Sequence, residues 1–167
     1  KMSNLINYLN KLKNKIILLS ISILAAQALY VIFSLGVGHP APDELEMVSS
    51  IKLFLEGGSW WNDEWFLQHF EHRMFLSSFI FFISAAMDSG NTLHLMYLGW
   101  FFFALCILPL YLLLKKIDEK LTWLIIPISY LIFNLGQTTC FTWSICSISW
   151  SLVSLLIILT IFFISKI

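Results

Sequence analysis

The residues best suited to chemistry lie between Trp60 and Arg73, where acids, histidines, an arginine and tryptophans interrupt an apolar sequence. On a helix, His69, His72 and Arg73 occupy positions i, i+3 and i+4 and therefore share one face. An arginine can hold a phosphate through two parallel hydrogen bonds, and neighbouring histidines can donate hydrogen bonds or protons. At a membrane entrance, such a face is suited to binding the phosphate of a lipid.

Two other interpretations of this stretch stay open. Tryptophans and charged residues are common at the membrane interface, so the stretch could be a polar helix start without chemistry. His69, Glu71 and His72 could also bind zinc, but Glu71 points off the shared face, and an H-x-x-H pair lacks the usual further ligands. We therefore expect no metal site from this motif.

An acidic pair, Asp43 and Glu44, follows the first long apolar segment at a predicted helix start. A carboxylate there could act as a general base toward a hydroxyl or an amine, or hold a divalent cation that binds phosphate. Alternatively, both acids simply cap the helix and complement its dipole. No cofactor is expected with certainty, and a divalent cation is the one candidate.

Two further polar features lie in or beside the later apolar segments. His94 stands one turn into a predicted membrane helix, where a hydrogen-bonded helix-end histidine is favoured over a functional one. A polar stretch that includes Gln137 and Trp143 separates the last two apolar segments. It is either a plain turn or a second polar wall of the site.

The composition is that of an integral membrane protein. Of the 167 residues, 59% are hydrophobic and 12% are charged, and the mean hydropathy is +0.83. About a quarter of residues are charged in soluble domains. The formal net charge of zero argues against a nucleic-acid partner, because phosphate binding needs a basic surface. Three cysteines form no CxxC pair and are predicted to be small core residues: Cys106, Cys140 and Cys146.

Residues 1–167 are predicted to form a single all-α module, a polytopic transmembrane bundle of about five membrane helices. Residues 38–73 form an outer acidic loop with interfacial helices, one of which ends at Gly57 and Gly58. The apolar part of the second membrane segment, Met74 to Met87, is about 14 residues long and by itself suggests a re-entrant piece. The predicted membrane helices cover residues 16–37, 65–87, 92–114, 121–135 and 145–164.

A signal peptide is a rival interpretation of the first segment, but its apolar run continues from Leu29 through Leu35. The lysines suggest an orientation, because cytoplasmic flanks are enriched in Lys and Arg. Lys11, Lys13 and Lys15 place the N-terminus in the cytoplasm, beside anionic lipid, and the acidic loop outside. If every later segment crosses fully, the lysines of residues 115–120 also lie outside, against this rule. Either residues 74–87 do not cross, or the membrane tolerates this lysine excess.

The order of these features resembles the GT-C superfamily of membrane glycosyltransferases, which use sugars linked to polyprenyl phosphate. Residues 68–73, Gln-His-Phe-Glu-His-Arg, are similar to the QHNEHR-type motif of a bacterial membrane-protein group with this architecture. Residues 137–143 are similar to that group's later Q-x-x-N-F-x-W stretch. Phe70 and Cys140 stand where the group commonly has Asn. The resemblance covers essentially the whole chain, which would correspond to the N-terminal part of a full-length member.

The resemblance implies transfer of a hexosyl or pentosyl group from a lipid-linked carrier to an acceptor at the outer face of a bacterial inner membrane. Asp43 would then be the catalytic base, with Glu44 beside it, and Arg73 and His72 would bind the carrier phosphate. The remaining substrate-binding residues would be His69, Glu71, Gln137 and Trp143. The alternative is a non-enzymatic membrane protein whose outer acidic loop binds a partner or ligand.

Overall fold

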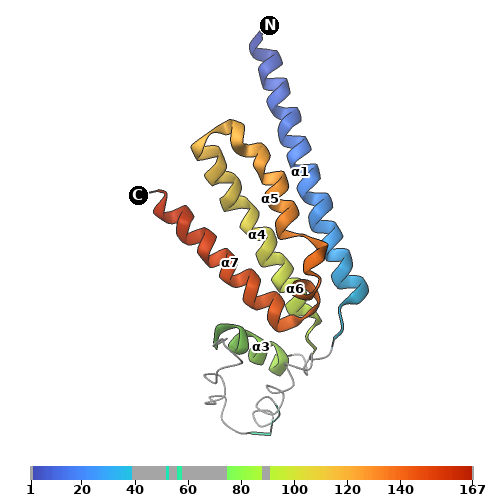
Figure 1. Ribbon diagram of the computed structural model, residues 1–167. Coiled ribbons are helices and arrows are strands. Elements are labelled where there is room, and N and C mark those ends of the chain that lie inside the picture. Colours follow the sequence, from blue (N-terminus) through green and yellow to red (C-terminus); the bar gives the residue numbers. More distant parts are fainter. Residues whose placement is uncertain (1, 39–51, 53–55, 58–74, 88–90, 167) are drawn as a thin grey trace.

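The computed structural model describes residues 2–38, 52, 56–57, 75–87 and 91–166, and all the regular structure within these ranges is helical (Figure 1). The order begins with α1 (Met2–Leu35), α3 (Phe75–Met87) and α4 (Leu93–Ile117). It continues through η3 (Glu119–Leu124), α5 (Ile125–Ile132), η4 (Leu135–Gln137), α6 (Thr139–Thr142) and α7 (Ser144–Ile164). The predicted all-α class is therefore confirmed for the described residues.

Three of these helices are long and apolar enough to cross a membrane: Tyr8–Leu35, Leu93–Ile117 and Ser144–Ile164. The shortest has 21 residues, which at 1.5 Å per residue gives about 31 Å, close to the thickness of a bilayer core. They correspond to the predicted helices at residues 16–37, 92–114 and 145–164. These helices indicate a membrane protein. The expected number of about five is not confirmed among the described residues.

The predicted membrane helix over residues 121–135 is not one continuous helix. The 3-10 helix η3 leads into α5, which has eight residues and ends at Ile132. Asn134 is extended, and its side-chain oxygen accepts a hydrogen bond from the Gly136 N–H at 2.8 Å. This local turn competes with the helix and stops it. The chain therefore returns across the bundle as a broken segment, residues 119–143.

The predicted helix over residues 65–87 is described only from Phe75 onward. The described part of this helix, α3, has 13 residues and is about 20 Å long. Phe81 and Phe82 form a buried cluster with Leu95 near the start of α4 and Ile148 near the start of α7. Figure 1 shows α3 lying across that end of the bundle. This packing agrees with the interpretation of residues 74–87 as a piece that does not cross.

The end of one predicted surface helix is also described. The Glu56 N–H donates to the Lys52 carbonyl at 3.0 Å, which is one helical turn. Gly57 follows with φ of 90°, a left-handed conformation that glycine adopts without strain. This local geometry is compatible with the predicted helix stop, whose other residues lie outside the described ranges.

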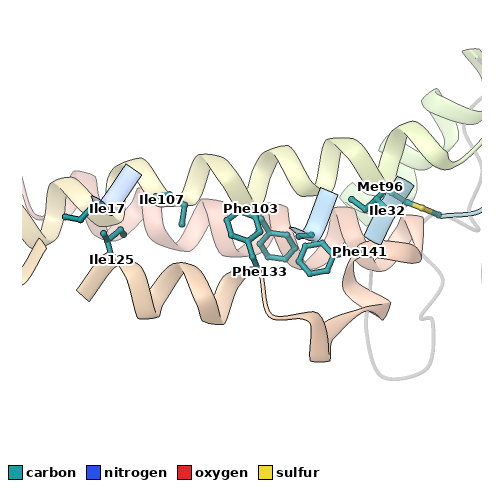
Figure 2. Close-up of a cluster of buried hydrophobic side chains, with 9 residues drawn as sticks. Ile17, Ile32, Met96, Phe103, Ile107, Ile125, Phe133 and Phe141 are labelled. Atoms are coloured by element: carbon teal, nitrogen blue, oxygen red, sulfur yellow. The ribbon is translucent and has the colours of Figure 1, made fainter. Parts of the chain in front are cut away.

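The helix α4 lies at the centre of the bundle, and both α1 and α7 pack against it. The Trp100 indole N–H donates to the Ala25 carbonyl of α1 at 2.9 Å, which satisfies a buried polar group. The ring centroids of Phe103 and Phe141 lie 5.7 Å apart. Figure 2 shows the row of apolar side chains along this core. Its buried members are Ile17, Ala28, Ile32, Met96, Phe103, Ile107, Ile125, Phe133 and Phe141.

The two ends of the bundle differ in charge. At one end, here called the loop end, the Thr92 hydroxyl donates to the Val37 carbonyl at 3.3 Å, so residues 39–90 leave and rejoin the bundle there. At the other, the lysine end, the Lys13 ammonium donates to the Glu119 carbonyl at 2.9 Å. The N-terminal lysines and the lysines of residues 115–120 therefore lie at the same end. Since Val37 and Thr92 meet at one end and Lys13 and Glu119 at the other, both groups of lysines lie at one end, as the positive-inside rule favours.

This arrangement predicts the sides on which single cysteines react. After Cys106, Cys140 and Cys146 are replaced by alanine, Asn91→Cys and Lys116→Cys should be labelled by a membrane-impermeant maleimide from opposite sides of the membrane. The reason is that α4 crosses once between them. Lys13→Cys should react from the same side as Lys116→Cys. Labelling of the Asn91 and Lys116 variants from the same side would contradict the arrangement.

A second prediction concerns the contact between α4 and α7 at Gly99. A methyl group added to Gly99 would overlap the Ser147 hydroxyl and lie 2.8 Å from the Ser147 carbonyl oxygen, which cannot move without shifting the α7 backbone. Gly99→Ala should therefore lower the free energy of unfolding by about 1–3 kcal/mol, the usual cost of overpacking. Unfolding in detergent followed by circular dichroism would measure it. The matched control is Leu108→Ala, because Leu108 is also on α4 but 61% exposed. An equal loss in both variants would refute this close packing.

Candidate functional site

Six of the predicted site residues lie outside the described residues: Asp43, Glu44, His69, Glu71, His72 and Arg73. The structure does describe the two points between which their loop runs. A Cβ atom on Gly38 would lie 3.0 Å from the Asn91 side-chain oxygen, so the two flanks of the loop almost touch. All six residues therefore belong to a segment that starts and ends at the loop end of the bundle.

Gln137 is described, and its position results from the break after α5. Its backbone N–H donates to the Asn134 carbonyl at 3.0 Å, and the Thr138 hydroxyl donates to the Leu135 carbonyl at 2.7 Å. These local bonds satisfy backbone groups that a continuous helix would otherwise pair. The Gln137 side chain itself is exposed to the cavity described next.

A cavity of about 310 Å³ lies between α4, α5 and α7. This volume is at the lower end of the range for small-molecule sites, about 300 to 1,000 Å³. Within the described part of the chain, its walls are apolar or neutral and carry no charged side chain. The lining residues are Phe103, Cys106, Leu110, Ile128, Leu131, Ile132, Gln137, Ser154 and Ile158.

Gln137 is exposed and lines this open cavity partway along the bundle. Phe103 stands ten residues after Leu93, the first residue of α4, and Ser154 stands ten residues after Ser144, the first residue of α7. Each is therefore about 15 Å along its helix from the loop end. Because Gln137 lines the same cavity, its amide lies at a similar depth. Polar groups at membrane depth are candidates for function by default.

Trp143 lies elsewhere. It joins α6 to α7, and its carbonyl accepts a hydrogen bond from the Ser147 N–H at 2.8 Å. Since α7 begins at the loop end, Trp143 belongs to that end, and it does not line the cavity. The structure therefore does not unite Gln137 and Trp143 in one polar wall. Gln137 faces the interior cavity, while Trp143 lies 38% exposed near the flanks of the loop.

The threonines between these two residues serve the backbone. The Thr138 hydroxyl donates to the Leu135 carbonyl, and the Thr142 hydroxyl donates to the Thr138 carbonyl at 3.0 Å. Such bonds satisfy the backbone carbonyls of a short irregular segment where water is not available to do so. The stretch is thus partly the plain turn that the sequence allowed.

His94 contacts a partner that the sequence did not reveal. Its Nε2 atom meets the Ser84 hydroxyl and links α3 to the first turn of α4. This agrees with a hydrogen-bonded histidine at a helix end. The contact fixes α3 across the loop end of the bundle, beside the flanks of residues 39–90.

Two residues of the cavity were not expected from the sequence, Cys106 and Ser154. The Cys106 thiol donates to the Phe102 carbonyl of its own helix at 3.3 Å. Ser154 is one of several small polar residues in α7, together with Ser147, Ser149, Ser151 and Thr160. The sequence distinguishes Ser154 only by its place within an apolar run, and many serines in membrane helices have such a place.

Within the described ranges, no group of three or more His, Cys, Asp or Glu residues is arranged to hold a metal ion. The divalent cation considered for Asp43 and Glu44 concerns residues outside these ranges.

Comparisons of the chain with protein-family models, with curated proteins and with solved structures found no match.

Proposed function

We propose that this chain is the membrane module of a GT-C-like glycosyltransferase that moves a sugar from a polyprenyl-phosphate carrier to an acceptor at the outer face. One observation carries the proposal. The flanks of residues 39–90 and the start of α7 at Trp143 meet at the same end of the bundle, opposite the lysines. The acidic pair, the Glu-His-Arg motif and part of the later polar stretch can therefore act on one side of the membrane.

The orientation proposed for this reaction follows from charge. The lysine end carries lysines from α1, α4 and η3, and the positive-inside rule places it in the cytoplasm. The loop end then faces outward, as expected for a bacterial inner-membrane protein. Compared with the lysine end, the loop of residues 39–90 is strongly acidic, and its basic residues are Lys52 and Arg73. Its acids are Asp43, Glu44, Glu46, Glu56, Asp63, Glu64, Glu71 and Asp88.

The proposed roles follow from residue chemistry. Asp43 removes a proton from the acceptor hydroxyl or amine as that group attacks the anomeric carbon of the sugar, and the bond from this carbon to the phosphate oxygen breaks, so that polyprenyl phosphate leaves. Glu44 supports Asp43 in orienting the acceptor. Arg73 holds the carrier phosphate through two parallel hydrogen bonds, with His72 as a further donor. His69 and Glu71 lie on the same short motif and complete the binding of the carrier head.

The first functional prediction compares two substitutions in the full-length protein. Arg73→Lys keeps the charge but loses the planar pair of donors, so affinity for a polyprenyl phosphate should fall by about 1–3 kcal/mol. Asp43→Asn should leave that affinity nearly unchanged and abolish sugar transfer, because an amide cannot accept the acceptor's proton. Lipid-phosphate binding and sugar transfer would be measured for both variants in the same membrane preparation.

Lys52→Arg provides the matched control, since the Lys52 ammonium is exposed on the same loop and lies 3.9 Å from the Glu56 carboxylate. This variant should bind the carrier as the parent does. If the parent binds a polyprenyl phosphate no better than a neutral polyprenol, the phosphate site is wrong. In that case, a loop that still binds a soluble cationic partner would support the non-enzymatic alternative.

A further inference from the structure

The cavity between α4, α5 and α7 has a polar side and an apolar side. Gln137 and Ser154 supply the polar groups, and the remaining wall toward the lysine end consists of aliphatic side chains. Leu110, Ile128 and Ile158 lie along that apolar part. A molecule that fits such a cavity has one polar head and a hydrocarbon body.

The polar groups of the cavity are not used by the protein. In α7, the Ser149 and Ser151 hydroxyls donate to carbonyls of their own helix at 2.6 and 2.5 Å, and Thr160 does the same at 2.8 Å. Within the described part of the chain, no such bond forms for the Ser154 hydroxyl or for the Gln137 amide. An unpaired amide in apolar surroundings is costly, on the order of 1–3 kcal/mol. Both groups are therefore available to a ligand.

The depth and charge of the cavity select the kind of head. Gln137 lies about 15 Å from the loop end along α4, close to mid-membrane. A phosphate or a quaternary ammonium is unfavourable at this depth without an opposite charge, and the described lining is neutral. A hydroxyl or a carbonyl needs one hydrogen bond, which the Gln137 amide can donate or accept. The head is therefore neutral.

The position of α5 explains how such a molecule would enter. α5 packs on α1 and α4, while α7 packs on α4 from its other side. Leu131 of α5 is 62% exposed at the edge of the cavity, so the opening faces the bilayer. A ligand dissolved in the membrane can thus reach Gln137 without passing through water.

We propose that this cavity binds a neutral long-chain lipid that carries a hydroxyl or carbonyl head. The head hydrogen-bonds to Gln137 and Ser154, and the chain lies against Leu110, Ile128 and Ile158. This site is separate from the phosphate site proposed for the loop, and it does not depend on glycosyl transfer.

The test uses photoreactive dodecanol with the full-length protein in lipid nanodiscs, followed by mass-spectrometric mapping of the labelled residues. Labelling should saturate and concentrate on the residues that line the cavity. Gln137→Met keeps the length of the side chain but loses the amide, so affinity for dodecanol should fall about fivefold, the effect of one neutral hydrogen bond. Affinity for the matching photoreactive dodecane should stay unchanged, which also shows that the cavity remains folded.

Ser154→Phe should fill the cavity and abolish saturable labelling. The matched control is Val153→Phe, because Val153 is the neighbouring residue on α7 and is 53% exposed away from the cavity. It should label as the parent does. The proposal is overturned if photoreactive dodecyl phosphate binds as tightly as the alcohol, or if Gln137→Met binds dodecanol normally. Labels spread evenly over the outer surfaces of α4, α5 and α7 would also overturn it.

Discussion

The lack of water in a membrane interior is the constraint on which this structure depends. Backbone N–H and C=O groups must find partners within the chain there, so a broken helix survives only if side chains and short turns replace its hydrogen bonds. The segment from Asn134 to Thr142 does this with the Asn134, Thr138 and Thr142 side chains. Gln137 lies in this broken segment and lines the cavity between α4, α5 and α7.

The same constraint explains the sidedness of the molecule. The described helix α3 packs on the starts of α4 and α7 through Phe81 and Phe82, and Val37 and Thr92 meet at that same end. The number of crossings then leaves the lysines of α1 and of residues 115–120 together, where Lys13 reaches the Glu119 carbonyl. The position of α3 at the loop end and the grouping of the lysines at the other end therefore belong to the same topology.

The sequence predicted the parts that depend on composition and length. Three long apolar runs correspond to the three long helices. The segment predicted over residues 121–135 is a 3-10 helix followed by the eight-residue α5, and it ends where the Asn134 side chain accepts from the Gly136 N–H; hydropathy reports neither feature. The depth of Gln137 and the role of Ser154 could not be predicted, since both depend on how α5 and α7 pack against α4. The roles of Asp43, Glu44 and the Glu-His-Arg motif stay predictions, because these residues lie outside the described ranges.

The two proposed sites differ in their depth in the membrane and in the charge of the lipid head that each would bind. A phosphate carries charge that costs about 2.5–3.5 kcal/mol or more at the centre of a bilayer, so its binding belongs at the loop end, where water and Arg73 can share that charge. A neutral head lacks this penalty and can descend to Gln137, where one amide is enough to orient it. The neutral lining of the cavity between α4, α5 and α7 therefore suits a neutral head, whereas the charged residues of the loop suit a phosphate. If both proposals hold, each site would disfavour the lipid head that suits the other, since an uncharged hydroxyl gains little from an arginine in water and the described lining beside Gln137 offers a phosphate no counter-charge.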